Sequence, residues 1–239
     1  MASREQLIET LTARLREIER PRLRSGRGGS PIGLRWPGLA GWLTSRGIAR
    51  GCLIEWLAEG PGAGSATLAW LAVRDLARHG EVVVLLDSQK QFFAPGANTL
   101  GVPPRQVVLL QPERRDDGLW SLEQALRCHG VGVVMCEVEK LSAKQFRRLQ
   151  LAAEVGGTWG LMLRPASTRR QPSWADVRLL IEPQPSPAVS GRRWRLEILR
   201  VRGAAAEDVA CVEFDDATDG LRLVSELAAA TTAIRAVGA

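Results

Sequence analysis

The sequence predicts an α/β fold with a mainly parallel sheet, on three observations. Runs of continuous apolar residues alternate along the chain with stretches of helical periodicity, which is typical of strands covered by helices on both faces. A glycine-rich turn separates the first apolar run from the first helical stretch. In a later run apolar and charged residues alternate with a period of two, which predicts a half-exposed antiparallel strand at one edge.

Each element of the predicted core follows from its own pattern. Apolar runs predict parallel strands at 52–57, 82–87, 106–110, 131–138, 158–164 and 177–182. Helical spacing predicts helices at 67–80, 119–130 and 142–157. Ser142 has the residue type of an N-cap for the last of these helices. The segments 192–202 and 209–214 are expected to pair as an antiparallel edge hairpin.

Both ends of the chain are predicted to be helical extensions. Residues 1–25 carry Leu and Ile at helical spacing, which indicates an amphipathic helix. Residues 26–45 are rich in Gly, Pro and Arg and are interpreted as a linker to a core at 46–220. Residues 221–239 place apolar residues on one helical side and are expected to form a C-terminal helix or tail. Each end either caps the core or docks a partner.

The net charge of +6 comes from one segment. The chain has 32 Lys and Arg against 26 Asp and Glu, and nine arginines against three acids lie between residues 164 and 202. The rest of the chain is therefore neutral, and an anionic surface or partner is expected at this segment. The candidate contacts to DNA or a partner are Arg164, Arg169, Arg170, Arg192, Arg193, Arg195, Arg200 and Arg202, together with Trp174, whose ring can stack on an unpaired base.

The composition excludes several classes of protein. With 45% apolar and 24% charged residues the chain is too apolar for a disordered protein, and no run is long enough to span a membrane. Four separated cysteines and two histidines do not have the spacing of a zinc site, so no metal is expected. The amino terminus carries charges throughout, unlike a secretory signal. These features predict a soluble, cytoplasmic protein with reduced cysteines.

The glycine-rich turn at residues 60–67 resembles an incomplete phosphate-binding loop. Gly60 and Thr67 match the template G-x-x-x-x-G-K-[ST], but Ser65 and Ala66 replace its second Gly and its Lys. Without that Lys, efficient hydrolysis of a nucleoside triphosphate is not expected, and the chain is predicted not to be an enzyme. The candidate remnants of the nucleotide site are Gly60, Gly62, Gly64, Ser65, Thr67 and Glu137.

The residues at two strand ends also bear on whether the chain binds or hydrolyses a nucleotide. Glu137 ends the strand at 131–138 and retains a carboxylate that can coordinate Mg²⁺. Asp87 ends the strand at 82–87, but no Glu that could activate a water follows it. Two interpretations stay open: a former nucleotide loop that now serves as a turn, and weak binding of ATP and Mg²⁺ without turnover.

Several motifs resemble known families. Residues 48–56 (IARGCLIEW) followed by Gly60-Pro61 resemble the entry to the RecA recombinase core, and Asp87 with its neighbours resembles the end of that core's second strand. Residues 174–179 (WADVRL) resemble the strand after the second DNA-binding loop of recombinases. Residues 193–203 (RWRLEILRVRG) and 213–218 (EFDDAT) resemble the ImuA family of RecA-like, SulA-like accessory proteins.

The resemblance to the ImuA family implies a function in mutagenic repair. It implies a RecA-like P-loop core and a non-catalytic role in SOS-induced translesion DNA synthesis. The implied partners are ImuB, which is an inactive Y-family polymerase homologue, an error-prone C-family polymerase, and RecA. The chain would recruit or organise these proteins at damaged DNA, without contact to a membrane.

The sequence also departs from recombinases. No room for a first DNA-binding loop remains between Glu137 and Ser142, and the second loop is reduced to about 165–173. A nucleotide-driven filament is therefore not expected. Two alternatives to the scaffold remain: a weak ATP-binding RecA paralogue that uses the turn at 60–67 with Glu137, and a single-stranded DNA-binding module that uses Arg169, Arg170 and Trp174.

Overall fold

The computed structural model describes residues 50–60, 62–186, 191–202, 208–217 and 220–228. The amphipathic helix predicted within residues 1–25 and the linker predicted at 26–45 lie outside the described residues. No helix in the described ranges is both long and apolar enough to cross a membrane.

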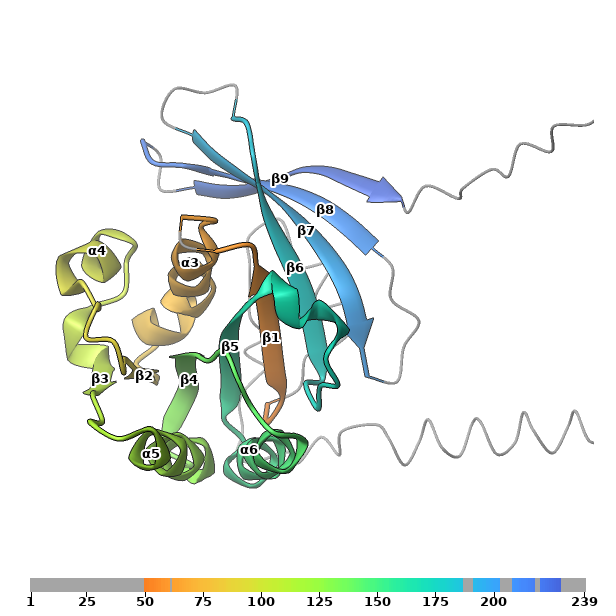
Figure 1. Cartoon of the computed structure of the whole chain (residues 1–239). Helices are drawn as coiled ribbons and strands as arrows, with labels where there is room; N and C mark the ends of the chain where they lie inside the picture. Colours follow the sequence, from red (N-terminus) through yellow and green to blue (C-terminus); the bar gives the residue numbers. More distant parts are fainter. Residues whose placement is uncertain (1–49, 61, 187–190, 203–207, 218–219, 229–239) are drawn as a thin grey trace, which may run out of the picture.

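The described elements follow the predicted alternation of strands and helices (Figure 1). The helices are α3 (Ser65–Arg78), α4 (Ala94–Thr99), α5 (Arg115–Arg127) and α6 (Ala143–Gly156), with short 3-10 turns η1 (Pro104–Gln106) and η2 (Ala166–Arg170). The strands are β1 (Leu53–Ala58), β2 (Val82–Leu86), β3 (Val107–Leu110), β4 (Val131–Glu137), β5 (Trp159–Pro165), β6 (Val177–Gln184), β7 (Gly191–Val201), β8 (Asp208–Asp215) and β9 (Gly220–Ala228).

The strands of the described chain form one sheet in the order β3-β2-β4-β5-β1-β6-β7-β8-β9. All neighbours from β3 to β6 are parallel, whereas β7, β8 and β9 each run antiparallel to the strand before them. The α/β class and the mainly parallel sheet are thus confirmed. Strand β1 lies in the middle, so its carboxyl end and the loops after β5 and β4 meet near the centre of the sheet.

Helices cover both faces of the central parallel part of the sheet (Figure 1). On one face, α3 buries Leu68, Leu71 and Leu76 against a core that continues beneath β7 and β8. On the other face, α5 and α6 pack side by side, with Leu122 and Phe146 in their shared core. Burial of each such side chain contributes about 1.5–3 kcal/mol. Continuous apolar strands are required because both faces are covered.

The start of α6 was predicted correctly. Ser142 accepts a hydrogen bond from the backbone N–H of Gln145 (3.3 Å), and the Gln145 side chain accepts one from the Ser142 backbone N–H (2.9 Å). This reciprocal pair satisfies two donors that have no partner within the helix. Gly157 ends α6 with φ of 66°, a conformation that favours glycine.

The C-terminal helix predicted at 221–239 is wrong for residues 221–228, which belong to strand β9, and residues 229–239 lie outside the described residues. Leu221 is buried and Arg222 is exposed, then Leu223 is half-buried and Val224 exposed, which is the period of a strand with one covered face. The spacing of Leu221 and Val224 suggested a helix, but pairing with β8 determines the structure. The antiparallel edge is therefore larger than the predicted hairpin.

Other differences concern short elements. Helix α5 begins at Arg115, four residues before the predicted start, and α4 was not predicted. The shortened loop at 165–173 contains η2, whose carbonyl groups are bound by side chains described below. The predicted strands agree with the observed ones to within about two residues at most ends, as is usual for element boundaries.

Candidate functional site

The glycine-rich turn joins β1 to α3 at the carboxyl edge of the sheet. Gly62 (φ 84°) and Gly64 (φ 82°) adopt the left-handed conformation, and Gly64 directly precedes the first residue of α3. Ser65 begins the helix and Thr67 lies in its first turn, which Leu68 closes by donating to the Gly64 carbonyl (3.0 Å). The turn therefore has the strand-turn-helix position at which phosphates bind in other α/β proteins.

Trp194 of β7 packs against this turn. Its indole Nε1 donates to the Ala63 carbonyl at 3.1 Å, and a Cβ added to Gly64 would lie 2.2 Å from the same nitrogen. Glycine at position 64 is therefore required by the packing of the turn against the antiparallel edge, as well as by its φ angle. Ala63 of the turn is buried, and the Trp194 indole fixes the turn against β7.

The turn offers a phosphate backbone amides but no side-chain cation. Gly60 to Thr67 contain no Lys or Arg, and exposed Ala66 stands at the position of the missing Lys. Glu137, at the end of β4, is exposed. In the described chain no group of three His, Cys, Asp or Glu side chains is arranged to hold a metal ion.

Asp87 follows β2 at the same edge, and its carboxylate organises the loop that comes after it. It accepts hydrogen bonds from the backbone N–H of Gln91 (2.8 Å) and Phe92 (3.0 Å) and from the side-chain amide of Gln111 (3.0 Å). Burial raises the pKa of Asp87, but these hydrogen bonds to the charged form outweigh it and hold the pKa below its ordinary value. The carboxylate thus stays ionised and acts as a loop anchor.

A buried charge cluster lies beside the turn, on strands β1, β5 and β6. The side chain of Glu55 is fully buried, with one carboxylate oxygen 2.5 Å from Arg164 Nη1 and the other 2.5 Å from Arg178 Nε. The two arginine side chains are only 1% and 10% exposed. The cluster therefore holds two cations and one anion inside the protein, and its remaining donors need partners.

The remaining donors of the two arginines bind neighbouring loops. Arg178 binds the loop after β5, and Arg164 binds mainly the loop after β4. Arg178 donates to backbone carbonyls in and after η2, the carbonyls of Thr168 (3.1 Å), Arg169 (3.2 Å) and Gln171 (3.4 Å). Arg164 donates to the carbonyls of Val138 (3.3 Å) and Glu139 (3.0 Å) and to the Gln171 side chain (3.2 Å). Glu55 thus fixes two loops through two arginines.

The role predicted for Arg164 does not fit its position. A contact to DNA or a partner needs an exposed guanidinium, whereas this one is buried against Glu55. The sequence carried a signal for the cluster, because Glu55 is an isolated charge within the apolar run CLIEWL and a buried carboxylate requires a partner.

Most of the other arginines in segment 164–202 also bind carboxylates of this chain. The pairs are Arg169 with Glu197 (2.8 Å), Arg192 with Asp216, Arg193 with Glu213 (2.6 Å), Arg195 with Glu182 (2.5 Å) and Glu197 (3.0 Å), and Arg202 with Asp176 (3.3 Å). With Arg164 and Arg178, seven of the nine arginines are paired within the described residues. Only three of these carboxylates, Glu55, Glu213 and Asp216, lie outside the segment, so folding offsets about half of the local excess of charge seen in the sequence.

Arg170 and Arg200 are the exceptions in this segment, and both are exposed. Within the described ranges neither has a carboxylate partner, and Arg200 Nη1 donates to the Ser173 carbonyl at 2.9 Å. Next to Ser173, Trp174 is 43% exposed, and the guanidinium of Arg147 from α6 lies 4.9 Å from the centre of its ring. Nothing in the sequence distinguishes Arg147, because it is one of several charges on α6.

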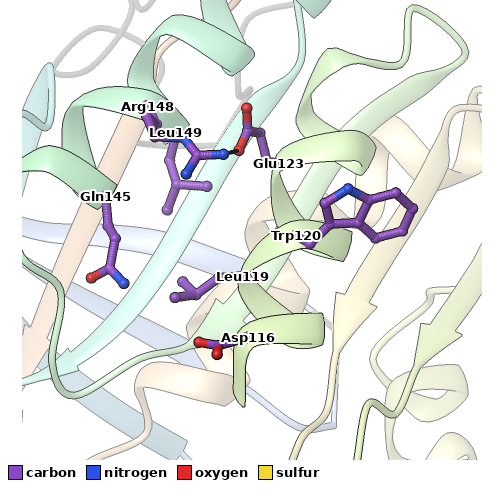
Figure 2. A pocket seen from close by; sticks show the side chains of 7 residues that line it. All are labelled: Asp116, Leu119, Trp120, Glu123, Gln145, Arg148 and Leu149. Atoms are coloured by element: carbon purple, nitrogen blue, oxygen red, sulfur yellow. Dashed lines mark hydrogen bonds and ion pairs between the residues drawn. The ribbon is translucent and has the colours of Figure 1, made fainter. Parts of the chain in front are cut away.

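A shallow groove of about 270 Å³ lies between α5 and α6 (Figure 2). Glu123 at its base is bound by Arg127 (3.0 Å) and Arg148 (2.5 Å), so its charge is satisfied. Figure 2 shows Trp120 extending away from Arg148, and this ring is 63% exposed. The residues that line the groove do not form a catalytic arrangement such as a nucleophile paired with a general base.

The comparisons with known proteins give one kind of relative. No protein-family model matches the chain. The chain is similar to the protein named ImuA in two strains of Caulobacter vibrioides, NA1000 / CB15N and CB 15, with 28% identity over 219 residues that cover 84% of each protein. This similarity confirms the family resemblance expected from residues 193–203 and 213–218, and it extends over most of both sequences.

Proposed function

We propose that this relative of ImuA is a non-catalytic accessory protein of SOS-induced, error-prone translesion DNA synthesis. The observation that carries the proposal is the similarity to ImuA along 84% of both chains. A RecA-like core is part of the proposal, supported by the strand-turn-helix unit at β1 and α3 within a parallel sheet. Its partners would be an ImuB-like polymerase homologue, an error-prone C-family polymerase and RecA.

The chemistry of the sheet edge supports a scaffold more than an ATPase. The turn at 60–67 supplies no cation for the β and γ phosphates, and Asp87 is engaged by three hydrogen bonds. The buried Glu55 cluster binds the neighbouring loops through Arg164 and Arg178, which supports loops that are positioned by the chain itself. A weak ATP-binding paralogue remains the alternative, with Thr67 and Glu137 as its residues.

Damage-induced mutagenesis separates the two functions. In a strain that lacks its own copy of the gene, the wild-type chain should restore the mutation frequency after DNA damage. Thr67→Ala and Glu137→Gln should restore it equally, because a scaffold needs neither group. If both variants fail while remaining folded, and the wild type binds Mg·ATP with an affinity that Thr67→Ala lowers, the ATPase alternative is correct.

Pull-down experiments from damaged cells test the partner contacts. Variants that lack residues 1–25 or residues 229–239 should lose part of the partner set, since most arginines of the basic segment are occupied within the chain. The second deletion must begin after Ala228, because Leu221 is buried and β9 pairs with β8. If both truncated proteins retain every partner, the chain ends do not dock them.

A further inference from the structure

We propose that the Trp174 cluster, defined as Trp174, Arg147, Arg170 and Arg200, binds single-stranded nucleic acid. These residues come from α6, η2 with the segment after it, and β7, so the fold brings together groups that the sequence separates. The site is independent of the turn at 60–67 and would work without ATP. The inference also does not depend on the proposed role in translesion synthesis.

Folding leaves some arginines near Trp174 without a carboxylate partner in the described ranges. In segment 164–202 seven arginines bind carboxylates, and Arg170 and Arg200 do not in the described ranges. Arg147 hydrogen-bonds the neutral side chain of Gln150 and likewise has no carboxylate partner there. Among the described residues, these three guanidinium groups therefore have no carboxylate partner and can bind an external anion.

One of these cations contacts an exposed tryptophan, and the other two are held near it by the chain. Arg147 stacks at 4.9 Å from the centre of the Trp174 ring, and Arg200 is bound to the Ser173 carbonyl one residue away. Arg170 is four residues before Trp174, so its Cα lies within about 14 Å of the Trp174 Cα. Trp174 is 43% exposed although the next residue, Ala175, is fully buried.

The ring and the cations together determine the chemistry of the ligand. An exposed indole offers a flat surface on which an unpaired base can stack, and arginines bind phosphate oxygens without reading sequence. A base within a duplex is already stacked on its neighbours, so its face is not available to stack on the indole. An acidic peptide would use the cations but would gain little from the indole. The combination of ring and cations therefore fits a single strand.

Binding is measured by fluorescence anisotropy of the full chain with a labelled deoxythymidine oligomer of about 15 nucleotides, which falls within known site sizes. We expect saturable binding that weakens with salt, with a slope of log affinity against log salt of about −2 for three phosphate contacts on a single strand. A uridine oligomer should bind in the same way, whereas a blunt duplex of the same length should bind more weakly.

Matched variants locate the site. Trp174→Ala should weaken binding by about tenfold, the typical effect of losing one stacked base, and Trp174→Phe should retain most of it. The control is Trp120→Ala, which removes another exposed tryptophan, on α5. Arg170→Ala should reduce the salt slope by about 0.7. Arg105→Ala changes the net charge equally on exposed η1 near the β3 edge and should leave the slope unchanged.

Several results would overturn the proposal. One is the absence of binding at about 50 mM salt, where phosphate contacts are strong. Another is equal binding by wild type and by folded Trp174→Ala and Arg170→Ala, which would place the contact elsewhere in the chain. A third is displacement of the oligomer by polyglutamate of equal charge together with insensitivity to Trp174→Ala, which would assign the surface to an acidic protein.

Discussion

Replacing Glu55 with Gln tests the buried charge cluster directly. The substitution keeps the size of the side chain but removes the anion that neutralises Arg164 and Arg178. Both arginine side chains are at most 10% exposed, so water cannot take over the role of the carboxylate. The two guanidinium groups would remain inside as uncompensated charges, and the amide group of Gln would face one of them with its own donors.

The expected loss is large compared with the stability of a domain. Removing one partner of a buried ion pair costs about 3–5 kcal/mol, because the other charge is left without compensation. The total free energy of unfolding of a domain is typically about 5–15 kcal/mol. We therefore expect Glu55→Gln to lower the free energy of unfolding by about 3–5 kcal/mol. We also expect faster hydrogen exchange in η2, whose carbonyls Arg178 holds.

Urea unfolding followed by circular dichroism measures this loss, and Glu213→Gln is the matched control. The Glu213 side chain is also buried and also binds two arginines, but the side chains of Arg193 and Arg222 are 25% and 70% exposed and can turn into water. The control should therefore cost less than half as much as Glu55→Gln. Equal losses for the two variants, with unchanged dependence on urea, would refute the reasoning that burial of the cations sets the cost.

Three further predictions concern other parts of the fold. Hydrogen bonds from Arg222 and Arg193 hold the pKa of Glu213 in the folded protein below its ordinary value of 4.5. The ionised carboxylate therefore stabilises the fold above pH 4.5, and this stabilisation is lost as the pH falls through the pKa of the folded state. The difference in unfolding free energy between wild type and Glu213→Gln should therefore shrink below about pH 4.5 in acid titrations. Gly62→Ala should lower the free energy of unfolding by about 1 kcal/mol, because only the left-handed backbone opposes a side chain there. Gly64→Ala should lower it by about 3 kcal/mol, because the added methyl group also clashes with the Trp194 indole. Thermal or urea unfolding measures both losses. Burial raises the pKa of Cys136 to about 12, so iodoacetamide should modify this thiol only after unfolding, as mass spectrometry of native and denatured protein would show.

The order of strands and helices was predictable because the central parallel strands, such as β1, β4 and β5, are covered on both faces. Full coverage demands unbroken apolar runs such as VVVLL in β2, and these are visible in the sequence. The capping box at Ser142 is equally local. Strand β9 was mistaken for a helix because Leu221 and Val224 have a helical spacing, whereas in the strand, which pairs with β8, they lie on opposite faces.

The candidate site was predictable only in part, because ion pairing acts between residues far apart in sequence. Counting charges located the basic segment correctly, but the partners of Arg164 and Arg193 are Glu55 and Glu213, which lie outside it. The sequence therefore overestimated the free charge of the segment. Trp174 could be singled out by its residue type, whereas Arg147 was found only when the fold placed it over the ring.

The central place of β1 has a consequence for how the chain is made. Its neighbours β5 and β6 are synthesised long after it, and Glu55 meets Arg164 across 109 residues of sequence while the Leu53 N–H meets the Asp176 carboxylate across 123. At about 5–20 residues per second on the ribosome, β1 waits several seconds or more before either neighbour emerges. During that interval β1 lacks both strands with which it pairs, and Glu55 lacks its arginine partners. Production of this protein in a cell should therefore depend on chaperones that shield the nascent chain until about residue 180 has been translated.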